Sequence, residues 1–382
     1  MCYTVDNMTK KSRLFWGSLR PLIGQMVGVG LFTLPFALSQ AGVGLGLIAI
    51  ILAALASLVS LLMFGDIALA LKGHHRFVGL MRELTGPVGQ FFAAIGLFGG
   101  IFGALTAYVL IGGNFAYNVF AGAVPMSLFA YRLIFFVLAA ILMLGGSLTV
   151  ARCQKYLILV YGLGTIILVI LTAPHLNLAH FVFATGHSWT LPFGAALFAF
   201  TGFAAIPEMR DTLGKYRTQL PRAITTGLVL VAVLYIIFGL AIVGVTGLST
   251  SPDTLRGLQD TLGPLFVGLA SLIGLATVLT AFVSQALVLQ KTLLSDYRWR
   301  YFISLTLVLA VPLVLFLLGA ADITRVISLT GGVFVGLAGL VLTIAYANLR
   351  RHPALNKRHL LIPRWLTLLT AGIFILNIIL AL

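Results

Sequence analysis

The chain has 382 residues, of which 60% are hydrophobic and only 9% are charged. Soluble globular domains carry about 25% charged residues, and disordered chains combine low hydrophobicity with high net charge. The composition therefore excludes both classes and predicts a protein that resides in a lipid bilayer. The net charge of +15 raises the separate question of a nucleic-acid partner, which depends on where the basic residues lie.

Eleven apolar stretches are long enough to cross the hydrocarbon core of a membrane, which takes about 20 residues of α-helix. Each stretch is continuously apolar, whereas the strands of a membrane β-barrel alternate between polar and apolar residues. The expected spans cover residues 14–38, 43–71, 91–120, 129–149, 156–174, 189–208, 223–247, 263–289, 301–319, 326–347 and 362–382. The sequence thus predicts an all-α integral membrane protein with 11 transmembrane helices.

Lys and Arg residues concentrate on one side of the membrane that these spans define. Of the 24 basic residues, all but Arg132, Arg256 and Arg325 lie in the N-terminal part or around the loops after even-numbered spans. Cytoplasmic loops carry the excess of Lys and Arg, so the segment 1–13 is predicted in the cytoplasm and the C-terminus outside it. Topology and attraction to anionic lipid explain the charge. The lipid bilayer of the cell membrane is expected as a partner, and nucleic acid is not.

The first and sixth spans contain residues that interrupt a helix. They read GQMVGVGLFTLP from residue 24 and FAFTGFAAIPE from residue 198, so that Gly30 and Gly202 each precede a proline by five residues. Glycine and proline both weaken a helix. Spans 1–5 and 6–10 form two sets of five, and an odd number inverts the second set. Paired interruptions in inverted repeats indicate a transporter site at the bilayer midplane; close packing through small residues is the alternative interpretation.

These two segments are similar to the amino acid/auxin permease family, and within it to its aromatic amino acid branch, the tryptophan/tyrosine permeases. Further matches are GDIALALKGHHRFVGLMRELTG after the second span, AYVLIGGN in the third and LTAF in the eighth. The resemblance covers nearly the whole chain and extends to the larger amino acid–polyamine–organocation group. It implies a five-plus-five inverted repeat with broken helices 1 and 6, in which 14–174 and 189–347 are the repeats and 362–382 is an additional C-terminal span.

A broken helix presents N–H groups to an anion and carbonyl groups to a cation, and a zwitterionic amino acid needs both. The resemblance and this dipole argument together place the substrate carboxylate at the first break and its ammonium group at the carbonyls of both breaks. Tyr108 matches a pocket position of the family, and phenylalanines flank the second break; ordinary packing is the alternative for both. The expected substrate-binding residues are Gln25, Gly28, Val29, Gly30, Tyr108, Phe200, Thr201, Gly202 and Phe203.

The coupling ion is expected to be H⁺, with Na⁺ as the alternative. Sodium-coupled relatives use carbonyls of span 1, here Gly24 and Val27, and two adjacent hydroxyl residues in span 8. Thr280 matches one of these hydroxyls, but Ala281 stands in place of the other.

Thr277 lies one turn away and could supply the missing oxygen, unless both threonines bond back to their own helix. Glu208 is the best candidate for a titrating group, because an ionisable residue within a span indicates function by default. An ion pair with Arg210 or another cytoplasmic base is the alternative for this carboxylate.

The sequence therefore predicts a secondary active transporter that carries an aromatic or other apolar amino acid by alternating access. A non-transporting amino acid sensor on the same scaffold is the competing class. The spans contain no paired acids, Ser–Lys pair or metal set for intramembrane catalysis, so no enzyme, cofactor or metal site is expected. No Walker A sequence appears either, which argues against transport driven by ATP.

Overall fold

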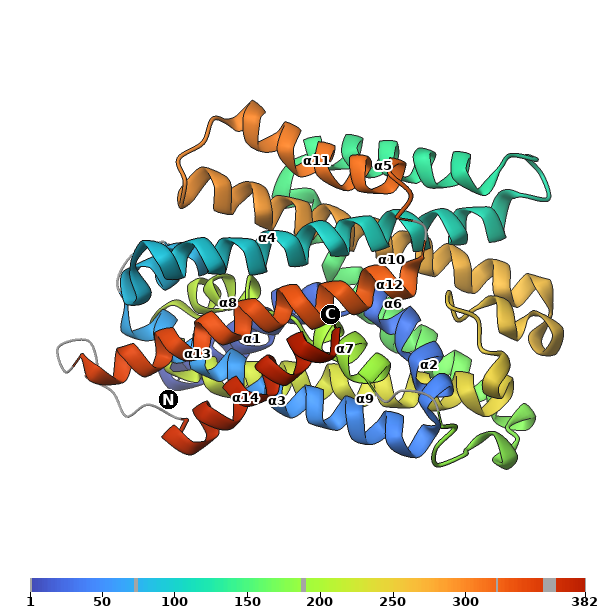
Figure 1. The fold of residues 1–382 in the computed structure, drawn as a ribbon, viewed down its shortest axis with the longest axis horizontal. Helices are drawn as coiled ribbons and strands as arrows, with labels where there is room; N and C mark the ends of the chain where they lie inside the picture. Colours follow the sequence, from blue (N-terminus) through green and yellow to red (C-terminus); the bar gives the residue numbers. More distant parts are fainter. Residues whose placement is uncertain (1, 72–74, 187–189, 321, 353–361, 382) are drawn as a thin grey trace.

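The computed structural model describes residues 2–71, 75–186, 190–320, 322–352 and 362–381, and these residues form helices joined by turns. Most of the longer helices run along one common direction (Figure 1). Within the described residues, six helices are long and apolar enough to cross a membrane, and the bent pair formed by the first two helices makes a seventh. The expectation of an all-α, multi-pass membrane protein is confirmed at this level.

The first half of the chain contains the first interrupted helix. Its helices are α1 (Cys2–Met26), α2 (Val29–Ala41), α3 (Val43–Ala70), α4 (Phe77–Phe120), α5 (Leu128–Leu144) and α6 (Gly146–Thr172). The chain bends by 56° between α1 and α2, where the glycines of the first span weaken the helix. Pro35 does not break α2, which continues through it to Ala41.

The second half contains the second interruption, between α7 and α8. Its helices are α7 (Thr190–Ala199), α8 (Ala205–Leu213), α9 (Leu220–Thr246), α10 (Gln259–Ser295), α11 (Tyr301–Leu317), α12 (Ile323–Leu329), α13 (Gly336–Arg351) and α14 (Arg364–Ala381). A short π-helix, η6 (Thr330–Val335), follows α12 directly and continues into α13. Residues 200–204 form the irregular link between α7 and α8.

The longest helices of the two halves share a kink near their first residues. In α4, Gly86 has a φ of 71° and is followed by Pro87; in α10, Gly263 has a φ of 81° and is followed by Pro264. Glycine adopts this left-handed backbone without the strain that a Cβ would add, and proline cannot donate the next helical hydrogen bond. Both helices therefore start with a short segment set at an angle to the main part.

The broken helices lie inside the bundle and pack crosswise, α1 against α8 and α2 against α7. Helix α4 runs across the centre and contacts α10 and α13, while α5 and α11 lie together at one edge (Figure 1), where Phe129 stacks on Phe316. The outer face of α5 exposes large apolar side chains such as Val137 and Ile141. Lipid chains are the natural contact for such a face, since water-soluble proteins rarely expose large contiguous apolar patches.

Candidate functional site

The first break lies at Val27 and Gly28, between α1 and α2. The first N–H groups of a helix have no partner within it, so α2 presents those at its start, around Val29 and Gly30, with the positive end of its dipole. A Cβ at Gly28 would lie 3.0 Å from the hydroxyl of Tyr108 on α4. The phenol therefore packs directly on the break, and an anionic group placed there would meet both backbone N–H groups and this hydroxyl.

The second break lies at residues 200–204 and packs against the first. The hydroxyl of Thr201 donates to the carbonyl of Leu197, 2.9 Å away, which satisfies one of the last carbonyls of α7. A Cβ at Gly202 would lie 2.5 Å from Cδ1 of Leu22 on α1. Glycine here lets the side chain of Leu22 pack closely against the link, in agreement with the alternative interpretation of small residues as packing residues.

The two phenylalanines of the second break point in different directions. Phe200 is fully buried, and its ring lies 5.3 Å from the ring of Tyr235 on α9. Phe203 stacks on Phe77 at 5.3 Å and also borders the central cavity. Only Phe203 therefore lies where it could contact a ligand in that cavity.

Tyr235 connects the carbonyl ends of both broken helices, and sequence reasoning missed it. Its hydroxyl donates to the carbonyl of Met26 at the end of α1, at 2.6 Å, and lies 3.3 Å from the carbonyl of Ala199 at the end of α7. The side chain is only 1% exposed. Nothing local to α9 marks this tyrosine, because its role depends on two carbonyls from helices far away in the sequence.

A narrow central cavity opens beside the two breaks and is lined by residues of both. Of the expected substrate-binding residues, the cavity wall includes Gln25, Gly30, Tyr108, Thr201 and Phe203. The other four, Gly28, Val29, Phe200 and Gly202, lie at the breaks outside this wall.

One face of α4 forms a wall of this cavity. Gly96, Gly100, Ala104 and Tyr108 all line it and follow one another at intervals of four residues, which places them on one side of a helix. A Cβ added at Gly100 would lie 4.0 Å from Cβ of Phe334, an ordinary contact, so this position tolerates a small added side chain. The interval of four, counted back from Tyr108, is a sequence signal that could have identified this wall.

Two buried glutamines form a polar boundary of the cavity. Nε2 of Gln25 on α1 lies 3.5 Å from Oε1 of Gln285 on α10, and both residues line the cavity. Each amide keeps further donor and acceptor capacity, since an amide can make up to four hydrogen bonds. Gln285 was not among the expected residues, because the family resemblance indicates hydroxyl residues in the eighth span.

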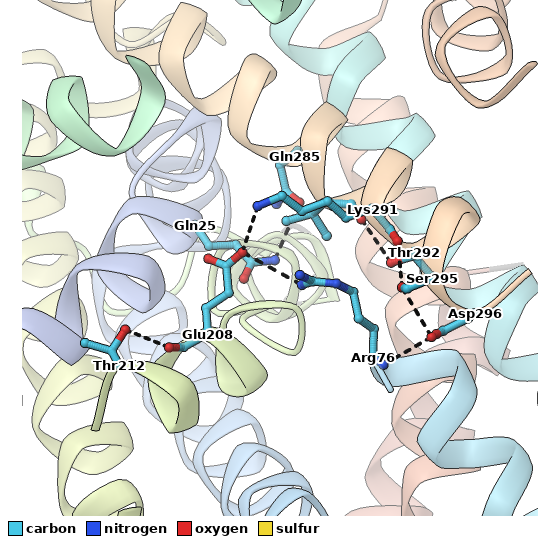
Figure 2. A network of polar contacts seen from close by, with 10 residues as sticks. Gln25, Arg76, Glu208, Thr212, Gln285, Lys291, Thr292, Ser295 and Asp296 are labelled. Carbon is cyan, nitrogen blue, oxygen red and sulfur yellow. Dashed lines mark hydrogen bonds and ion pairs between the residues drawn. The ribbon is translucent and has the colours of Figure 1, made fainter. Parts of the chain in front are cut away.

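Glu208 on α8 lies close to the glutamine pair and makes ion pairs with Arg76, directly before α4, and with Lys291 on α10. One carboxylate oxygen lies 3.5 Å from Nζ of Lys291 and 3.8 Å from Nη1 of Arg76. Figure 2 shows both cations turned toward Glu208 from the opposite side of the network. Arg210 instead pairs with Asp211, at 3.1 Å. The observed contacts therefore match an ion pair of Glu208 with other bases.

The residues expected for ion coupling do not form one cluster of oxygen ligands in the described part of the chain. Ala281 lies beside the first break, 3.3 Å from where a Cβ of Gly28 would be. The hydroxyl of Thr277 donates to the carbonyl of Ile273, and that of Thr280 lies within hydrogen-bond distance of the carbonyls of Ala276 and Thr277. Both threonines therefore bond back to α10, and Gly24 and Val27 are buried in α1 and at its end.

A cavity lined mainly by apolar and small side chains, placed where two membrane helices break, is characteristic of a membrane transporter. The breaks place backbone dipoles next to uncharged polar side chains. Groups of this kind can bind a polar solute reversibly. The chain belongs to the tryptophan/tyrosine permease family, whose model matches residues 10–380. It is therefore an amino acid permease and not an enzyme.

Two solved structures have the same fold. MhsT in complex with L-phenylalanine is 17% identical and has a TM-score of 0.70, with 96% of this chain and 97% of that chain covered. Mhp1, a nucleobase-cation-symport-1 family transporter in a closed conformation with bromovinylhydantoin bound, is 14% identical with the same TM-score, and the coverage is 96% and 91%. At these identities the likeness concerns the fold alone. Comparison with curated protein sequences gives no significant match.

Proposed function

We propose that this permease carries an aromatic amino acid across the cell membrane by alternating access, as a symporter coupled to H⁺. The observation that carries the proposal is a cavity bordered by both helix breaks and by one face of α4. The breaks offer backbone groups of both signs, which suits the zwitterionic part of the substrate. Gly96, Gly100 and Ala104 border this cavity with small side chains, which suits an apolar part of the substrate.

The substrate lies with its carboxylate at the start of α2, against the N–H groups of Gly28, Val29 and Gly30 and the hydroxyl of Tyr108. Its ammonium group faces carbonyls near Gln25 and in the second break, at Phe200, Thr201 and Gly202. Phe203 and the α4 wall border its side chain. An aromatic side chain supplies about 150–250 Å² of apolar surface for burial, which favours it over alanine or serine in a cavity with few polar groups.

We further propose eleven spans with N-terminus inside and C-terminus outside, arranged as inverted repeats 14–174 and 189–347 with 362–382 added. Two features of the fold support the repeat. The broken helices pack crosswise, α1 on α8 and α2 on α7, as a two-fold relation requires. The helices α4 and α10 each start with a kink at a left-handed glycine followed by proline, at Gly86 and Gly263.

Coupling to H⁺ rests on the groups near the first break. A sodium ion prefers several oxygen ligands, but Thr277 and Thr280 use their hydroxyls on their own helix, and Ala281 has no oxygen in its side chain. Glu208 is the titrating group of the proposal, facing Arg76 and Lys291. Protonation removes its attraction to both cations, which favours separation of α8 from α4 and α10 at this end of the cavity.

Uptake of labelled amino acids into proteoliposomes tests the proposal. With an imposed pH gradient and no sodium, we expect tryptophan or tyrosine to accumulate above equilibrium. Accumulation only with a sodium gradient would refute proton coupling and support a sodium symporter. Tight binding without accumulation under either gradient would refute symport and support a sensor.

A matched pair of variants tests the role of Glu208. Glu208→Gln removes the carboxylate that contacts Arg76 and Lys291, so we expect substrate binding to persist while accumulation driven by pH is lost. Asp211→Asn removes a carboxylate one turn away that pairs with Arg210, and we expect accumulation to persist. Equal accumulation by both variants would refute the assignment of Glu208.

A further inference from the structure

A second cavity, separate from the central one, lies where α13 ends and α14 begins. Three of its lining residues are arginines, from both helices; the lining comprises Ala347, Arg350, Arg351, Arg364, Thr367 and Leu368. It is partly open to the surface of the protein. Three guanidinium groups around one space repel one another, so the arrangement favours an anion between them.

Arg350 supplies the strongest indication of a ligand. Its Nε and Nη2 atoms are buried and have no hydrogen-bond partner in the described part of the chain. Its guanidinium group lies 5.1 Å from the ring centre of Tyr346, which holds it in place. The hydroxyl of Tyr346 is itself engaged, since it donates to Asp66 at 2.7 Å and accepts from the N–H of Ile362 at 3.1 Å.

Buried donors of a charged group are costly when they remain unpaired. Basic residues in the last turn of α13 complement its dipole, which accounts for Arg350 and Arg351 but not for Arg364 on another helix. Within the described residues, none of the three arginines makes an ion pair. A planar guanidinium group binds two oxygens of a phosphate at once, so a phosphate group fits these donors.

The surroundings of the cavity favour a lipid as the source of this phosphate. Next to Arg364, the side chains of Trp365 and Leu368 are 66% and 73% exposed. An exposed tryptophan beside basic residues is typical of the membrane–water interface. In the topology proposed above, this end of α14 faces the cytoplasm, where anionic lipids gather.

We propose that Arg350, Arg351 and Arg364 bind the phosphate of an anionic phospholipid headgroup in the cavity between α13 and α14. The acyl chains then lie along the exposed apolar side chains of α14. The assignment to the cytoplasmic leaflet rests on the topology in the proposed function. The binding site itself rests on the arginines and does not depend on that topology. Bound lipid stabilises the folded transporter because it binds the native state alone.

The test compares the full chain in nanodiscs of phosphatidylcholine with and without phosphatidylglycerol. We expect phosphatidylglycerol to raise the Tm and to remain bound in native mass spectrometry. Arg350→Gln should weaken this retention about tenfold or more, the factor for loss of one charge-assisted hydrogen bond. Arg222→Gln, which changes an exposed arginine at the start of α9, is the matched control and should retain the lipid as the unaltered chain does.

Arg364→Gln provides a second test in case Arg350→Gln fails to fold. Arg364 is exposed, so its replacement should leave the packing of the protein intact. Equal retention by Arg364→Gln and Arg222→Gln would overturn the proposal. Stabilisation by inorganic phosphate in phosphatidylcholine, without any effect of phosphatidylglycerol, would overturn the lipid and leave free phosphate as the ligand. Transport assays do not enter this test, so its failure is distinguishable from failure of the proposed transport function.

Discussion

Tyr235→Phe removes one hydroxyl from the junction of the two broken helices and leaves the ring in place. The hydroxyl donates to the carbonyl of Met26 at 2.6 Å and lies 3.3 Å from the carbonyl of Ala199, so the buried Met26 carbonyl loses its donor. An unsatisfied buried acceptor costs about 1–3 kcal/mol. The phenylalanine ring keeps the contact with Phe200, and packing losses are therefore small.

This cost changes substrate affinity if the bond holds the breaks in their binding geometry. A penalty of about 1–3 kcal/mol corresponds to roughly a 5- to 150-fold rise in Kd. We expect a rise in this range for labelled tryptophan binding to purified Tyr235→Phe. The Km of uptake should rise by a similar factor, because the substrate senses the altered ends of α1 and α7 before transport starts.

Tyr131→Phe is the matched control. The hydroxyl of Tyr131 donates to the carbonyl of Val124 at 2.7 Å, away from the central cavity, and the residue is 3% exposed. Both variants lose one phenol–carbonyl hydrogen bond, so both should lower the Tm. Only Tyr235→Phe should raise the Kd; an unchanged Kd in that variant, or an equal rise in both, would refute the reasoning.

Three further predictions concern the cavity and its surroundings. Gly100→Val fills the space beside α4, so uptake of tryptophan should fall by at least about fivefold relative to alanine, as expected for overpacking by about 1 kcal/mol or more; competition assays measure this ratio. Glu208→Gln should increase hydrogen–deuterium exchange in α8, since its ion pairs with Arg76 and Lys291 are lost. Thr280→Ala should retain uptake driven by pH, since Thr280 bonds to its own helix; a loss restored by sodium would contradict this.

The sequence predicted the positions of helix breaks more accurately than the positions of helix ends. Glycines mark the break at Gly28, and the expected span 14–38 lies within the bent pair α1 and α2. The expected span 91–120, by contrast, begins well inside α4, which starts at Phe77. Hydropathy detects only the part of a helix that suits lipid, so polar extensions such as the segment before Gly86 escape it.

The sequence predicted only those residues of the candidate site that belong to a recognisable local motif. The glycines of the first break and Tyr108 could be named from the sequence and its family resemblance, and Tyr108 does border the cavity. Tyr235 and Gln285 could not, because their contacts with Met26 and Gln25 join helices that are far apart along the chain. Such contacts depend on how the helices pack, which no local pattern encodes.

The contact between Gly30 and Ala199 limits how the protein can vary. A Cβ at Gly30 would lie 2.5 Å from Cβ of Ala199 and 2.9 Å from its Cα. Glycine at position 199 would remove the first clash, but the Cα is backbone and the second would persist. A second-site substitution at Ala199 therefore cannot rescue Gly30→Ala, and a library randomised at both positions should yield active transporters with glycine alone at position 30.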